Sequence, residues 1–116
     1  MSDLLFGEVK QAVVQWISDN KEKFKCARIT IEIVENSDER LYAVLSLSEC
    51  MAAIVVAEAD FAPYRFVSFE AVGAIDGNPN MVCSWYDDEN TNVEEVVANL
   101  DSALDTTIKH DAKKMP

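Results

Sequence analysis

Residues 41–47 read LYAVLSL, and this short stretch decides the fold class. Its leucines and its alanine occupy the odd positions, and Tyr42, Val44 and Ser46 occupy the even ones. A period of two places the two sets on opposite faces of an extended strand. The stretch therefore predicts a β-strand with the odd-numbered side chains directed into a core.

A second alternating stretch precedes it. Ala27, Ile29, Ile31 and Ile33 lie on one side, with Arg28, Thr30 and Glu32 on the other. The polar residues 35–39 between the two stretches are typical of a turn. We therefore expect a hairpin with a strand that begins near residue 27.

Three more strands are expected after this hairpin. Residues 51–57 form an uninterrupted apolar run, which predicts a central strand with both faces covered. A fourth strand is expected at 64–74, with Phe66 on one face and Val67, Phe69 and Ala71 on the other. Turn residues 77–79 separate it from a fifth strand at 81–86.

Helices are expected at both ends of this meander. The first spans about residues 2–20, with Ser2 as its N-cap, and its apolar positions recur at helical spacing: Leu5, Val9, Val13, Trp16 and Ile17. The second begins with a capping box formed by Thr91 and Glu94. Its apolar stripe consists of Val93, Val96, Val97, Leu100 and Leu104.

Together these elements predict an α+β fold: an N-terminal helix, a five-stranded, mainly antiparallel meander sheet and a C-terminal helix, with both helices packed on one sheet face. We expect one domain at 1–105. Residues 106–116 are polar and are expected to form a flexible tail.

Charge is distributed unevenly along the chain. The 116 residues have a formal net charge of −11, and the segment between Arg65 and Lys109 contains nine carboxylates but no lysine or arginine. Such a field repels nucleic acid and anionic lipid and attracts a basic protein. We therefore expect a protein partner with a basic surface, and neither a nucleic-acid nor a membrane partner.

The cysteines indicate the compartment. Cys26, Cys50 and Cys83 are widely spaced and form no Cys-x-x-Cys pair. No apolar run approaches the length of about 20 residues that spans a bilayer, and the N-terminus lacks the basic flank of a signal peptide. We expect a cytoplasmic protein.

Catalytic and cofactor motifs are lacking in the sequence. His110 is the single histidine and falls in the expected tail, so a relay with a nucleophile is not predicted. Residues 76–80 lack the ligand spacing of a calcium loop, and three glycines cannot form a phosphate-binding loop. We expect no enzyme activity, no metal and no cofactor.

The face of the sheet without helices is the candidate binding surface. Aromatic and apolar residues expected there are Tyr42, Val44, Phe66 or Phe69, Trp85 and Tyr86. Tyr86 is the predicted anchor. The carboxylates predicted to contact the partner are Glu70, Asp76, Asp87, Asp88 and Glu89.

The order of these features resembles a known family. The segments 16–21 (WISDNK), 84–89 (SWYDDE) and 93–96 (VEEV), arranged around a strand meander, are similar to immunity proteins of bacterial polymorphic-toxin systems, in particular the TriTu-type group. The resemblance covers residues 5–105. It implies a cytoplasmic antidote, a monomer or weak homodimer, that binds a cognate toxin domain and covers its active site or substrate surface.

An alternative is an acidic secretion chaperone or adaptor. Such a protein would bind an extended effector segment as a stable dimer with an exposed hydrophobic groove. A small-ligand-binding domain is a third class, and it would need a concave apolar pocket with convergent polar groups.

Overall fold

The computed structural model describes residues 6–58, 66–75, 78–88 and 90–113. Within these residues, three helices and five strands follow in the order α1, α2, β1 to β5 and α3. Their bounds are α1 Phe6–Asp19, α2 Lys21–Cys26, β1 Thr30–Asn36, β2 Arg40–Ser46, β3 Cys50–Ala57, β4 Val67–Ile75, β5 Asn78–Tyr86 and α3 Val93–Lys113. The predicted α+β class is confirmed.

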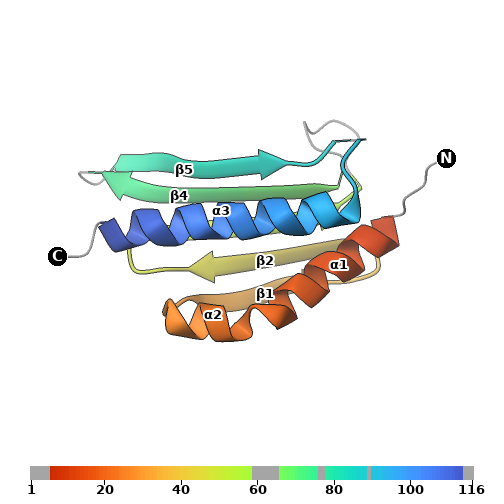
Figure 1. The fold of residues 1–116 in the computed structure, drawn as a ribbon, viewed down its shortest axis with the longest axis horizontal. Helices are drawn as coiled ribbons and strands as arrows, with labels where there is room; N and C mark the ends of the chain where they lie inside the picture. Colours follow the sequence, from red (N-terminus) through yellow and green to blue (C-terminus); the bar gives the residue numbers. More distant parts are fainter. Residues whose placement is uncertain (1–5, 59–65, 76–77, 89, 114–116) are drawn as a thin grey trace.

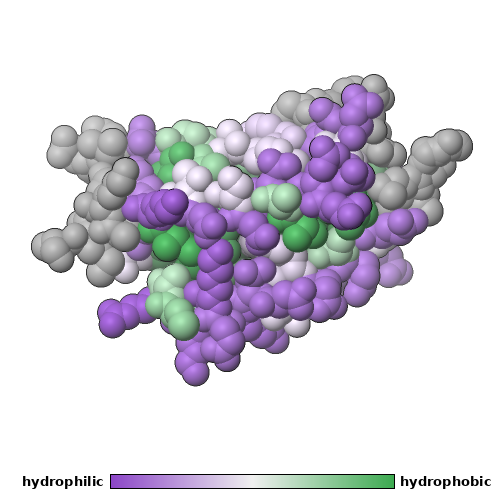
Figure 2. Space-filling view, viewed as in Figure 1, coloured by the Kyte–Doolittle hydropathy of each residue, from purple (hydrophilic) through white to green (hydrophobic). Residues whose placement is uncertain are grey.

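The five strands form one antiparallel sheet in the order of the sequence, β1-β2-β3-β4-β5. Figure 1 shows α1 and α3 on the same face of this sheet, with α3 lying along the strands. Hydrophilic side chains cover much of this helical side, with apolar patches between them (Figure 2). Among the described residues, no helix lies on the opposite face of the sheet.

The core lies between the sheet and the helices. The odd positions of β2, Leu41, Ala43 and Leu45, are fully buried, as the period of two predicts. On β4 the residues predicted to share one face are also fully buried: Val67, Phe69 and Ala71. The helices contribute their apolar stripes, which comprise Val9, Val13, Trp16 and Ile17 from α1 and Val96, Leu100, Ala103 and Leu104 from α3.

Polar contacts join α3 to both α1 and α2. The indole Nε1 of Trp16 donates to Asp101 Oδ1 on α3 at 2.7 Å. Lys23 Nζ on α2 lies 2.5 Å from Asp105 Oδ1, also on α3. The tryptophan contact is partly buried, so it contributes more than the exposed ion pair does.

The beginning of β1 differs from the prediction, because residues 21–29 first form a short helix and its cap. The amide of Arg28 donates to Lys25 O at 3.1 Å, and that of Ile29 donates to Phe24 O at 2.8 Å. This is the Schellman pattern, and Arg28 has the positive φ of 59° that the pattern requires. Ile29 is therefore buried beside Phe24 as part of a helix end, and the strand begins only at Thr30.

The prediction of a flexible tail at 106–116 is wrong for the residues that the structure describes. Helix α3 continues to Lys113. Thr107 is fully buried, with its hydroxyl donating to Ala103 O at 2.8 Å, and the buried Asp111 accepts a 2.5 Å hydrogen bond from the amide of Glu49. The last turns of the helix are thus held by the β2–β3 turn.

The N-terminal cap of α3 also lies one residue further along than predicted. Asn92 Oδ1 accepts from the amide of Glu95 at 2.8 Å, and Glu95 Oε1 accepts from the amide of Asn92 at 3.0 Å. These two reciprocal bonds form the capping box, in place of the predicted pair of Thr91 and Glu94. Thr91 instead bonds to Asp88. The predicted N-cap of the first helix, Ser2, lies outside the described residues.

Candidate protein-binding surface

The face of the sheet opposite the helices, called the open face from here on, is built of three rows of side chains across the strands. The antiparallel register places Thr30, Ser46, Met51, Val72 and Met81 in the first row. Met51 and Met81 are each 52% exposed and Val72 is 40% exposed. Three large apolar side chains on adjacent strands therefore form one continuous exposed row.

The second and third rows extend this apolar area and add carboxylates. The second row consists of Glu32, Val44, Ala53, Glu70 and Ser84. The third consists of Glu35, Tyr42, Val55, Ser68 and Tyr86. A shallow hollow of about 200 Å³ is lined by residues of the first two rows, among them Glu70, and by Tyr42 of the third row.

Negative charge predominates on the open face. Its three rows contain the carboxylates Glu32, Glu35 and Glu70 and no lysine or arginine. Arg40 lies just beyond the third row, with its guanidinium over the Tyr42 ring at 5.3 Å and its Nε 3.8 Å from Glu35 Oε1. The apolar row and its negative surroundings are suited to a basic protein surface with exposed apolar side chains.

Two of the predicted site residues meet on this face. Glu70 projects from β4 and Tyr86 from β5, two residue pairs apart along the ladder. The Tyr86 hydroxyl donates a hydrogen bond to Glu70 Oε2. This bond fixes the ring of the predicted anchor at one side of the open face and leaves Glu70 exposed.

Asp87 contradicts the prediction that it belongs to the charged surface. Its side chain is only 3% exposed, and Oδ1 accepts hydrogen bonds from the amides of Phe66 at 2.8 Å and Val67 at 2.9 Å. The amide of Asp87 donates in turn to Val67 O at 3.2 Å. Asp87 therefore joins the end of β5 to the start of β4 and has a structural role.

Of the three remaining predicted carboxylates, only Asp88 is among the described residues, and it does not belong to the rows of the open face. Asp88 is exposed, and its Oδ1 accepts from the amide of Asn90 at 2.8 Å and from the Thr91 hydroxyl at 3.1 Å. It thus orders the entry to α3. Asp76 and Glu89 lie outside the described residues.

The aromatic residues predicted for the open face divide between the two faces. Tyr42, Val44 and Tyr86 are on it, but Phe66 and Phe69 are buried in the core, and Trp85 pairs with Phe69 on the core side. Tyrosine and phenylalanine have similar β-propensities, so residue type alone did not predict which face of the sheet each aromatic side chain occupies.

Sequence reasoning missed the row of Met51, Val72 and Met81. Residues 51–57 were predicted to be covered on both faces, but in β3 only the even positions are buried. Both faces of this strand are apolar, so the period of two is invisible in its hydrophobicity pattern. Which residues of three strands share a row depends on the register, which the sequence alone did not define.

A metal-binding cluster and a membrane-spanning helix are both absent from the part of the chain that the structure describes. No group of three or more histidine, cysteine or acidic side chains is placed to hold a metal ion there. His110 Nε2 is buried without a hydrogen-bond partner among the described residues. Within the same residues, no helix has the length and apolar character needed to cross a bilayer.

Comparisons with protein-family models, curated proteins and solved structures found no match to this chain.

Proposed function

We propose that this chain is a non-catalytic immunity protein that binds and neutralises a cognate toxin domain through its open face. The observation that carries the proposal is the exposed row of Met51, Val72 and Met81 beside the carboxylates Glu32 and Glu70. The resemblance to immunity proteins supplies the toxin as the partner. The surface supplies the chemistry by which the two would bind.

The apolar row and the carboxylates have different roles in this proposal. Desolvation of contiguous apolar side chains at the centre of an interface provides most of the affinity. The net charge of −11 accelerates association with a basic toxin and makes the rate sensitive to salt. By covering the basic substrate surface of the toxin, the immunity protein would exclude the toxin's substrate.

A heterologous partner suits this face better than a second copy does. Face-to-face docking of two copies would bring Glu32, Glu35 and Glu70 of each copy near the same residues of the other, and like charges at an interface are repulsive. The alternative function, a secretion chaperone, requires a stable dimer. A measurement of molar mass in solution therefore separates the two functions.

The test begins with capture of the partner on the tagged protein from cells that produce it naturally. The captured domain is then expressed in a bacterial reporter strain, alone and together with this chain. We expect growth arrest by the domain alone, rescue by the wild-type chain, and an equimolar complex. A captured domain that does not arrest growth, or a secreted effector bound to a dimer, would contradict the immunity function.

The contact surface is tested with a charge-matched pair of double variants. Met51→Lys with Met81→Lys places two cations in the apolar row, whereas Gln11→Lys with Ser102→Lys places them at exposed helical positions. We expect the first variant to bind the captured domain about 30-fold more weakly or worse, since hot-spot losses reach about 2 kcal/mol, and the second to retain most of its affinity. Equal affinities would remove the open face from the interface. Thermal unfolding of both variants confirms that they are folded.

A further inference from the structure

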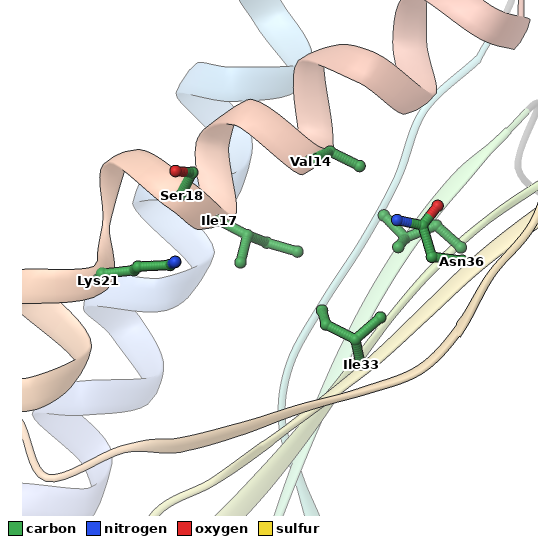
Figure 3. A pocket seen from close by; sticks show the side chains of 7 residues that line it. Val14, Ile17, Ser18, Lys21, Ile33 and Asn36 are labelled. Carbon is green, nitrogen blue, oxygen red and sulfur yellow. The ribbon is translucent and has the colours of Figure 1, made fainter.

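A groove separates α1 from the edge strand β1, on the helical side of the sheet (Figure 3). It has a volume of about 310 Å³ and is lined by Val14, Ile17, Ser18, Lys21, Ile33, Asn36 and Leu41. In Figure 3, Val14 and Ile17 project from the helix toward the side where Ile33 projects from the strand. The walls are thus apolar, with polar groups at the margins.

The groove lies at the middle of β1, between two points where helices contact this edge strand: α2 packs against β1, and Lys10 Nζ of α1 donates to Asn36 Oδ1 at 2.6 Å. Ile33 belongs to the core-side row that contains Ala43, Ile54 and Phe69, all fully buried. Ile33 itself is 45% exposed, because α1 packs mainly against α3 and β3 and does not cover this position of β1. An apolar position that the strand pattern directs inward therefore remains open to a ligand.

Strand β1 is also an edge whose outer side has no neighbouring strand among the described residues. The bulge between Ile33 and Glu35 interrupts the pairing with β2, which resumes at Glu35, and the extra residue there, Val34, is 52% exposed. Residues 30–33 therefore form a short regular edge that can accept the backbone of another extended chain.

We propose that this edge binds an extended segment of a partner protein, which pairs with residues 30–33 and inserts an apolar side chain into the groove. Residues directly opposite each other on neighbouring strands share a face. The segment should therefore have apolar side chains opposite Ile31 and Ile33, on the groove side. Opposite Glu32, on the open-face side, it should have a lysine or arginine.

Charge favours this partner over a second copy of the chain. Glu32 is exposed and has no ion pair with a described residue, so a cation opposite it gains a new partner. Pairing of β1 with itself, in registers centred on Ile31 or Glu32, would place the two Glu32 carboxylates opposite or diagonal to each other. Each copy also has a net charge of −11, which opposes association of two copies.

This inference does not require the toxin-binding function, because the edge of β1 and its groove are distinct from the exposed row of Met51, Val72 and Met81, and only Glu32 belongs to both surfaces. The probe is a fluorescein-labelled peptide with the sequence Thr-Lys-Val-Lys-Val-Lys-Thr. Its control has the same composition in block order, with the lysines together and the valines together. Anisotropy titrations at physiological salt separate specific pairing from attraction to a negative protein, because both peptides have the same charge.

Two tryptophan variants on α1 test the groove. Ser18 is exposed at the groove, so Ser18→Trp fills it without altering the core. Gln11 is exposed on another side of the helix, near Val93 and Glu94, and Gln11→Trp is the matched control. We expect the alternating peptide to bind Ser18→Trp about tenfold more weakly than the wild type, and to bind Gln11→Trp like the wild type.

The pairing is located by amide shifts in NMR spectra. Shifts confined to residues 30–36 and α1, together with weaker binding of the block peptide, would support the proposal. Equal binding of the two peptides, equal effects of the two tryptophan variants, or loss of binding in Val72→Lys on the open face would overturn it. A dimer of the free protein that Ser18→Trp dissociates would also overturn it, since the occupant would then be a second copy.

Discussion

Replacement of Asp87 by alanine distinguishes a structural carboxylate from a binding one. The sequence predicts Asp87 in the partner-binding surface, where its loss would slow association and leave stability unchanged. The structure instead buries it against the amides of Phe66 and Val67. We therefore expect Asp87→Ala to lower the free energy of unfolding and to affect partner binding only through the folded fraction.

The magnitude follows from the two hydrogen bonds. A hydrogen bond to a charged group contributes about 1.5–3 kcal/mol, and a buried amide left without an acceptor costs about 1–3 kcal/mol. Because these two quantities overlap, we expect a loss of about 3–4 kcal/mol for the pair. With a urea m-value of about 1.5 kcal/mol/M, the unfolding midpoint should fall by about 2 M.

Equilibrium urea unfolding, followed by tryptophan fluorescence and by circular dichroism, measures this loss. Asp88→Ala is the matched control, because the neighbouring carboxylate is exposed and should cost about 1 kcal/mol or less. Asp87→Asn retains one oxygen acceptor without the charge, and about half of the loss is expected. If Asp87→Ala is no more destabilising than Asp88→Ala, the inferred role of Asp87 as a link between β4 and β5 is wrong.

Three further outcomes are expected. Leu100→Ala should destabilise the fold by about 3 kcal/mol in the same urea assay, because Leu100 is fully buried between α3 and the sheet; a loss below about 1 kcal/mol would mean that this contact is loose. Asn92→Ala should lower the free energy of unfolding by about 1 kcal/mol through loss of the capping box, and Glu94→Ala should hardly change it. If thermal unfolding shows Glu94→Ala to be the more destabilising of the two, the capping box predicted from sequence, Thr91 with Glu94, is the correct one. Burial raises the pKa of the Cys83 thiol, so less thiolate is present at pH 8 and iodoacetamide should modify it more slowly than the exposed Cys26; peptide mapping that finds Cys83 modified first would refute this.

Several elements could be predicted from local physics alone. The alternation of Leu41, Ala43 and Leu45 identified both the strand and its inward face, because side chains of a strand point to opposite sides in turn. The stripe of Val96, Leu100 and Leu104 identified α3 for the same kind of reason, with a helical period. Such patterns depend on residues that are close together in the sequence, so they can be recognised without knowledge of long-range contacts.

The length of α3 could not be predicted from such local patterns. Residues 106–113 are polar, and the sequence predicted a flexible tail. They are helical because the buried Thr107 and Asp111 find hydrogen-bond partners, the latter on the β2–β3 turn more than 60 positions away in the chain. A polar side chain is stable in a buried site only when the fold supplies its partner.

The sequence by itself therefore determined the order of the five strands and the flanking helices, the inward face of β2 and the uneven charge, because each is a property of neighbouring residues. Only the tertiary structure decided which residues form the candidate binding surface. The register of three strands aligns Met51, Val72 and Met81 in one exposed row. The amides of Phe66 and Val67 donate hydrogen bonds to Asp87, which is buried and not part of the charged surface. Both outcomes depend on contacts between distant segments, and such contacts form only when the whole sheet is assembled.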